Sequence, residues 1–135
     1  MDTSLILKNV EFPGITGGMS DGDRTRFALK LLDFLVVKNK AKYKPLNLSG
    51  GQQQRVAIAR GLMNDPKIVL ADEPTENLDS TTAAEVFNLL TLLSREFKRT
   101  IIMVTHSPEL AAATDRAIHI RDGSIEKDVI NIKRQ

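Results

Sequence analysis

The stretch IVLADEP, residues 68–74, decides the class of fold. Its first four residues are apolar and partly β-branched, which is typical of a strand buried on both faces of a parallel sheet. The strand leads directly into two acids, Asp72 and Glu73. A second short apolar run, residues 100–105, follows a long amphipathic segment. The order strand, helix, strand predicts an α/β fold in which helical crossovers join parallel strands.

Helical and turn patterns surround these two strands. Apolar residues recur every three or four positions over residues 20–35, 52–63 and 79–97, which predicts three helices. Ser and Pro at 107 and 108 suit the N-cap and first position of a shorter helix that ends near residue 113. The segment 117–127 contains an Asp-Gly turn and predicts a β-hairpin.

Three segments are expected to be irregular. Residues 13–18, Pro-Gly-Ile-Thr-Gly-Gly, favour a loop because proline and glycine together favour turns. Residues 38–44 form a basic connector that Pro45 ends, and residues 131–135 are expected to be a solvated end.

The composition narrows the possible classes of protein. A length of 135 residues with 41% hydrophobic residues suits one domain. The net charge of +2, without basic residues clustered among aromatics, indicates no nucleic-acid partner. The absence of cysteine excludes disulfides and thiolate metal sites and fits a reducing cytosol. No apolar run approaches the roughly 18 residues of a membrane span, and no signal-peptide pattern is present, so any membrane role requires a partner.

A candidate phosphate site lies at the start of the helix predicted from residue 52. The unpaired N–H groups and the positive dipole end of a helix attract anions, and two glycines let the backbone come close to one. Taken alone, the same sequence also fits an ordinary glycine-rich helix start. The residues concerned are Ser49, Gly50, Gly51 and Gln52.

Candidate catalytic groups follow the two predicted strands. Open α/β sheets bind ligands at the carboxyl ends of their strands. Of the two acids there, Asp72 and Glu73, one can hold magnesium while its neighbour orients and deprotonates a water. His106 ends the second strand and can lie level with Glu73 if the strands are neighbours. The alternatives are that the acids are merely solvated and that the histidine is only a polar strand end. His119 is interpreted as a structural or surface residue. Residues 77–79 alone suggest an ordinary helix cap.

Four segments occur together in a fixed order. They are PLNLSGGQQQRVAIAR at 45–60, IVLADEP at 68–74, NLDS at 77–80 and VTH at 104–106. In order and spacing they resemble the ATP-binding-cassette (ABC) ATPases of membrane transporters, and the resemblance runs over about residues 9–127.

Three shorter features look most like the subfamily that powers lipoprotein release and macrolide-type export. They are the triple glutamine at 52–54, the segment NVEFP at 9–13 and the closing RDG at 121–123. Glu76 is a departure, because the subfamily often has glycine there, and it bears on the local turn.

The resemblance implies a catalytic site divided between two subunits. The signature segment, residues 49–52, would contact the γ-phosphate of ATP held by a second ATPase subunit in a homo- or heterodimer. In the Walker B motif, Asp72 would help to hold Mg²⁺ through water, and Glu73 would be the base that polarises the attacking water. His106 would be the switch that senses the γ-phosphate, and Asp79 of the D-loop would couple the two sites.

The resemblance also implies an organisation and a set of partners. Residues 9–63 would form a helical signature subdomain, in which about 11–45 rest on a transmembrane permease. Residues 64–127 would form the core with Walker B, D-loop and switch histidine, and 128–135 a tail. The chain would bind ATP and Mg²⁺ and lie in the cytoplasm, held to the inner face of the membrane through the permease.

The 135 residues contain no Gly-x-x-x-x-Gly-Lys-Ser/Thr. This Walker A loop cradles the β-phosphate and its lysine reaches the β- and γ-oxygens. The glycines at 14–18 are followed by Met19 and not by lysine. The family's glutamine-bearing loop (Q-loop) also precedes the region of resemblance. We therefore expect a fragment or truncated paralogue that does not bind ATP alone but completes one site in a dimer, unless the missing part is encoded upstream of Met1.

The family's sheet predicts a structural consequence. There, the strand that leads into the Walker A loop lies between the switch-histidine strand, here 100–105, and the next strand, here 117–120. Each buried N–H or C=O left unpaired costs roughly 1 to 3 kcal/mol, so an unfilled gap could cost a typical domain's stability of about 5 to 15 kcal/mol. We expect either that these two strands pair directly or that another chain completes the sheet.

Two alternative functions stay open at this point. One is a non-catalytic module that regulates an ABC transporter by docking on it. The other is a fragment of a DNA-repair type of ABC ATPase, which shares the signature. The compact segment before the signature and the lack of coiled-coil heptads argue against the latter.

Overall fold

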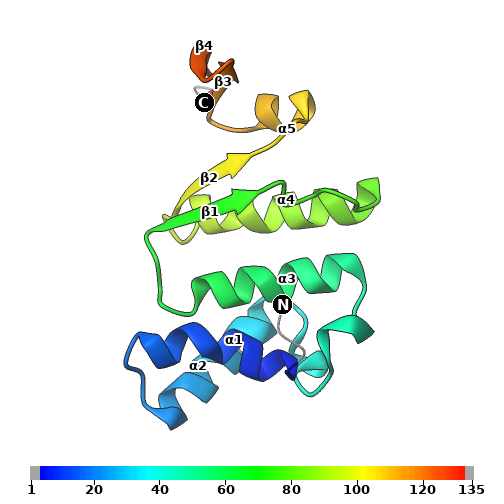
Figure 1. The fold of residues 1–135 in the computed structure, drawn as a ribbon, viewed down its shortest axis with the longest axis vertical. Helices are drawn as coiled ribbons and strands as arrows, with labels where there is room; N and C mark the ends of the chain where they lie inside the picture. Colours follow the sequence, from blue (N-terminus) through cyan, green and yellow to red (C-terminus); the bar gives the residue numbers. More distant parts are fainter. Residues whose placement is uncertain (1–3, 133–135) are drawn as a thin grey trace.

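The structure is a computed structural model, and it describes residues 4–132. It confirms the predicted α/β class: helices form one end, a parallel strand pair follows, and a hairpin lies at the other end (Figure 1). The elements are α1 (Ile6–Thr16), α2 (Asp21–Phe34), η1 (Lys38–Lys40), η2 (Pro45–Asn47), α3 (Gly50–Leu62), β1 (Ile68–Asp72), α4 (Ser80–Arg95), β2 (Thr100–Val104), α5 (Pro108–Ala113), β3 (Arg116–Arg121) and β4 (Ser124–Ile130).

One buried apolar cluster joins the four longer helices. Ile6 of α1, Leu32 of α2, Val56 of α3 and Val86 of α4 are all fully buried within it. Each such side chain contributes about 1.5 to 3 kcal/mol relative to an exposed one. The cluster fixes α3 against α4. This packing positions the start of α3, where the signature segment lies.

Helix α1 corrects the loop predicted for residues 13–18. The helix continues through Pro13 and ends at Thr16. Proline costs one backbone hydrogen bond and a steric clash inside a helix, but the burial of Ile6 and Val10 offsets that cost. Gly14 also allows a close approach, because a Cβ there would lie 3.0 Å from the terminal methyl carbon of Met63.

Strands β1 and β2 form a parallel pair in which Leu70 lies opposite Ile102. One face of the pair packs against the core cluster through Val69, Ala71 and Ile101. On the other face Leu70 is 76% exposed, and Ile68, Ile102 and Val104 are each more than half exposed. The prediction of strands buried on both faces is therefore wrong for the described chain, because no element within residues 4–132 covers this second face.

Strands β3 and β4 form a separate antiparallel hairpin. The predicted direct pairing of 100–105 with 117–120 is wrong: β2 pairs with β1 and β3 pairs with β4. In Figure 1 the hairpin lies beyond α5, away from the parallel pair. The outer edge of β2 thus has no strand beside it among the described residues.

The hairpin is longer than its sequence pattern predicts, because β4 runs to Ile130. Asn131 is hydrogen-bonded as well: its N–H donates to Asp115 O at 2.7 Å and its Nδ2 to Ala111 O at 3.1 Å. The prediction of a solvated end is wrong at this residue, and 133–135 lie outside the described residues. No helix within residues 4–132 has the length and apolar character that crossing a membrane requires.

Candidate functional site

The signature segment forms a capped helix start. The Ser49 Oγ accepts a hydrogen bond from the N–H of Gln52 at 3.2 Å, and the Gln52 Oε1 accepts one from the N–H of Ser49 at 3.0 Å. This reciprocal capping box uses two of the donors that a helix start leaves unpaired. The N–H groups of Gly50 and Gly51, the first two helical residues, have no intrahelical acceptor. They and the hydroxyl hydrogen of Ser49 are the donors that an anion can meet.

The two acids of the Walker B segment have different surroundings. Asp72 ends β1 on the exposed side of the sheet. Glu73 turns inward: its side chain is 21% exposed, and its Oε1 is buried without a hydrogen bond. The two acids therefore differ in access to solvent, because Asp72 is exposed whereas the Oε1 of Glu73 is buried.

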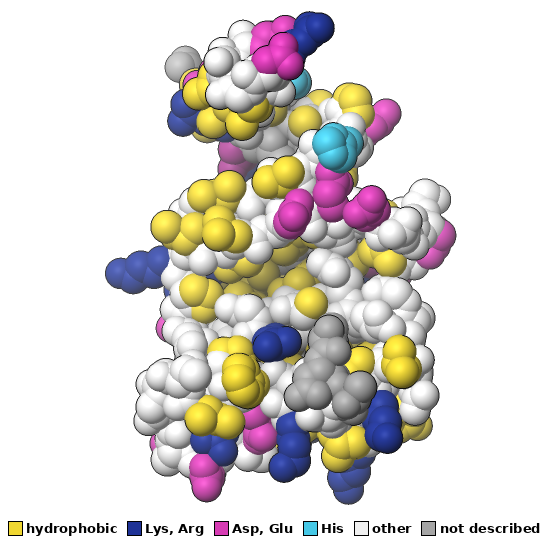
Figure 2. Space-filling view, viewed as in Figure 1, with side chains coloured by type: hydrophobic (Ala, Val, Ile, Leu, Met, Phe, Trp, Pro, Cys, Tyr) yellow, Lys and Arg dark blue, Asp and Glu magenta, His cyan; other side chains and the backbone are white. Residues whose placement is uncertain are grey.

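His106, the predicted switch histidine, lies beside the inward-facing acid. Strands β1 and β2 are parallel neighbours. Glu73 and His106 therefore both follow the carboxyl end of a strand, at the same end of the sheet. His106 Nε2 is 3.4 Å from Glu73 Oε1, and the imidazole is 97% exposed. Figure 2 shows acidic side chains gathered next to a histidine at this end of the strand pair, beside its apolar surface. The structure therefore brings together two of the residues singled out from the sequence.

The backbone between the acids and the D-loop is strained. Glu73 has a φ of 45° and Asn77 a φ of 61°, in the left-handed region that side chains rarely adopt. The N–H of Glu73 donates to Val104 O at 2.8 Å, which fixes this turn to β2. Such strain tends to occur at functional sites. Glu76 is not among the residues with a positive φ, so its position does not require glycine.

Asp79 caps α4 as the sequence predicts. Its Oδ2 accepts from the N–H of Thr82 at 3.1 Å and its Oδ1 from the Thr82 hydroxyl at 2.5 Å. The Thr82 hydroxyl, followed by its N–H, lowers the pKa of the Asp79 carboxyl below its ordinary value. The D-loop carboxylate is thus ionised at neutral pH and held in one orientation.

A small cavity of about 290 Å³ lies between the signature helix and the loop after β1. Residues from both segments line it, among them Gly50, Gln53, Pro74 and Leu78. The signature and D-loop segments are therefore neighbours within one chain. Thr82 lies between the two segments, close to Gly51 and hydrogen-bonded to Asp79. It was not singled out from the sequence, because contacts between distant segments leave no local pattern.

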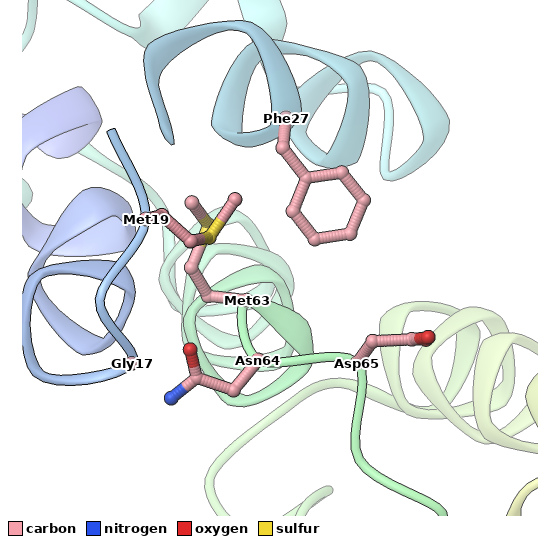
Figure 3. Close-up of a pocket in the computed structure, with 6 residues that line it drawn as sticks. All are labelled: Gly17, Met19, Phe27, Met63, Asn64 and Asp65. Carbon is pink, nitrogen blue, oxygen red and sulfur yellow. The ribbon is translucent and has the colours of Figure 1, made fainter. Parts of the chain in front are cut away.

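A second cavity of about 400 Å³ lies at the opposite end of α3 (Figure 3). Figure 3 shows the Met19, Met63 and Phe27 side chains around it, from three different segments. Asp65 at its rim forms an ion pair with Arg99 at 2.5 Å. None of the residues predicted to act on phosphate lines this cavity, so it is separate from the candidate site.

The carboxylates at this site suit Mg²⁺ only if phosphate oxygens also bind the ion. Within residues 4–132, no three His, Asp or Glu side chains are grouped closely enough to hold a metal ion by themselves. Mg²⁺ commonly keeps several waters and takes only one or two carboxylates together with substrate phosphates. The exposed carboxylate of Asp72 suits that kind of site.

Comparison with known proteins shows the family of the chain. The family model described as ABC transporter matches residues 3–76. The chain is 44% identical over 119 residues to the lipoprotein-releasing system ATP-binding protein LolD of Bacteroides fragilis, covering 88% of this chain and 55% of that protein. It is 47% identical over 121 residues to the macrolide export ATP-binding/permease protein MacB of Marinobacter nauticus, covering 90% of this chain and 19% of the other.

Solved structures give the same result for the fold. A dimeric ATP-binding cassette in a post-hydrolysis state, bound to ADP and Pi, superposes with a TM-score of 0.84 at 40% identity, over 99% of this chain and 60% of that chain. The chain therefore spans about half the length of the cassettes that it matches.

Proposed function

Because this chain belongs to the ABC transporter family of ATP-binding cassettes and is similar to its LolD and MacB members, we propose that it serves an export or lipoprotein-release transporter as its ATPase subunit. It couples ATP hydrolysis at a dimer interface to transport. The observation that carries the proposal is the meeting of Glu73 and His106 at the carboxyl end of the strand pair, where Glu73 Oε1 lies 3.4 Å from His106 Nε2. This arrangement suits a group that positions a water.

The proposed roles follow from where the groups lie. Bound Mg²⁺ supplies positive charge that offsets charge on the phosphate oxygens. Asp72 helps to hold that ion through water. Glu73 orients and polarises the attacking water, and His106 senses the γ-phosphate from the exposed strand end. Residues 49–52 meet the γ-phosphate of ATP on a second subunit, to which the Asp79 carboxylate transmits the state of the site.

The division of labour between the subunits follows from the motifs present. No Walker A sequence occurs in the 135 residues, so the β-phosphate must be held by a segment outside them. In a dimer of a polypeptide of these 135 residues with an intact cassette, the signature segment completes the partner's site and gives one working site. A permease is the proposed second partner, which places the chain on the cytoplasmic side of the membrane.

Mixing this chain with an intact homologous cassette and measuring phosphate release tests the proposal. We expect release to rise with added chain and to saturate at one nucleotide bound per heterodimer. Ser49→Arg places a long cation where the phosphate should lie and is expected to abolish the rise. Ser124→Arg, the same change at an exposed hairpin residue, is the matched control and should leave it intact.

Other outcomes discriminate between the functions. A partner whose rate does not respond to the chain, or a heterodimer with two working sites, contradicts the proposal. A rate that changes equally with wild type and Ser49→Arg favours the regulatory module, because that function requires docking without a phosphate contact.

A further inference from the structure

Gly51 of the signature helix and Thr82 of α4 are in unusually close contact. A Cβ built on Gly51 would lie 2.3 Å from the Thr82 Cγ2, a distance that real Cβ atoms do not tolerate. Gly51 is buried, so its backbone has no room to rotate an added methyl group toward solvent. The second glycine of the signature is therefore required by packing within its own chain, independently of any phosphate.

Thr82 has little freedom to move away. Its hydroxyl donates to Asp79 Oδ1 at 2.5 Å, and its N–H donates to Asp79 Oδ2 at 3.1 Å. A β-branched side chain in a helix has few rotamers, and the hydroxyl bond selects the one in which the methyl group faces Gly51. The orientation of the D-loop carboxylate and the position of the methyl group are thus linked through one side chain.

Two further contacts hold the same helices together. A Cβ on Gly50 would lie 3.1 Å from the Leu78 Cδ2, so the first signature glycine packs against the D-loop as well. One turn further along α3, Arg55 forms an ion pair with Glu85 of α4 at 3.1 Å and donates to Leu35 O at 3.2 Å. The starts of α3 and α4 are therefore expected to move together.

We propose that Thr82 is a positioning residue that links the D-loop to the signature: its hydroxyl and N–H hold Asp79, and its methyl group sets the position of the Gly50 and Gly51 N–H groups. This inference rests on the proposed function of the signature. A shift of about 1 Å at a phosphate-contacting group can cost about a hundredfold in rate. A change of Asp79 at the dimer interface would therefore reach the phosphate contacts through Thr82.

A double substitution tests the link. Gly51→Ala alone pushes its methyl into that of Thr82, and we expect the partner's phosphate release to fall about ten- to a hundredfold. Thr82→Ser removes the Cγ2 but keeps the hydroxyl, and the nearest remaining Thr82 atom, Cβ, is 3.8 Å from the point that a Cβ on Gly51 would occupy. Combining the two should restore release to within about threefold of Thr82→Ser, a coupling typical of residues in contact.

The control is Thr81→Ser, the same change at the exposed neighbour, which should not rescue Gly51→Ala. All rates are measured at a temperature at which unfolding curves show each variant folded, so that lost stability is not mistaken for lost positioning. A neutral Gly51→Ala, or a double variant as impaired as Gly51→Ala, overturns the proposal, because Thr82 would then not be what requires glycine.

An NMR measurement on the chain alone separates this inference from the proposed function. Amide shifts of residues 50 and 52 should move in Gly51→Ala and return toward those of Thr82→Ser in the double variant, whereas residue 51 is left out because its own type has changed. If they do so while the wild-type chain leaves the partner's rate unchanged, the packing link stands and the proposed function fails. If they do not return, the link itself is wrong.

Discussion

Replacing one leucine on each side of the structure tests where its stability resides. Leu90 on α4 is 3% exposed and belongs to the core cluster, whereas Leu70 on β1 is 76% exposed. Truncating a buried leucine to alanine loses its transfer free energy and leaves a cavity, at a cost of about 2 to 5 kcal/mol. Leu70 hides about a quarter of its surface, so a quarter of the roughly 1.5 to 3 kcal/mol for full burial gives less than about 1 kcal/mol.

Urea unfolding of the two variants measures this difference. We expect the free energy of unfolding to fall at least about 1 kcal/mol further for Leu90→Ala than for Leu70→Ala, with similar m-values. Equal losses would refute the reasoning, because they would show that the outer face of β1 and β2 is covered in solution. Sedimentation at the same concentrations would then show whether a second copy covers it.

Three further predictions concern the site. Isothermal titration of a purified polypeptide of residues 1–135 should detect no MgATP binding at micromolar concentration, because these residues contain no Walker A sequence to hold the β-phosphate; such binding would contradict the roles proposed above for the two subunits. Ser49→Ala removes the cap of α3 and should lower the free energy of unfolding by about 1 kcal/mol in urea, and a neutral effect would show that the capping box does not form. The pKa of Asp79 is lower in the folded chain than its ordinary value of 3.8. Its bonds to Thr82 therefore stabilise the fold at any pH above 3.8, and this stability is lost as the pH falls through the lower pKa of the folded state. Asp79→Asn can still cap the helix but does not titrate, so a plot of its stability against pH should lack that part of the slope.

Helix starts were predictable because their causes are local. Ser20, Ser49, Asp79 and Ser107 each accept a hydrogen bond from an N–H three residues on, and that spacing is visible in the sequence. The apolar stripe of α4 was equally visible, since residues 86, 90 and 93 are buried as their spacing predicts. The boundaries of α3, α4 and α5 accordingly agree with the predicted ones within two residues.

Features that depend on distant segments were not predictable in the same way. Pro13 breaks helices by local rules, but packing of α1 on α3 overrides them. The apolar runs of β1 and β2 indicate what the strands can bury, whereas their actual exposure depends on which elements are present to cover them. The contact between Gly51 and Thr82 joins residues 31 positions apart, and neither residue type signals it.

The left-handed backbone of Glu73 determines which substitutions there can be interpreted. Alanine or glutamine carries the same penalty at a φ of 45° as the native residue does, so comparing Glu73→Gln with wild type isolates the chemistry of one oxygen atom. Glycine is free of that penalty, and Glu73→Gly would relax the main chain as well as delete the carboxylate. A kinetic defect in the glycine variant would then mix two causes, which makes the amide the informative isostere at this position.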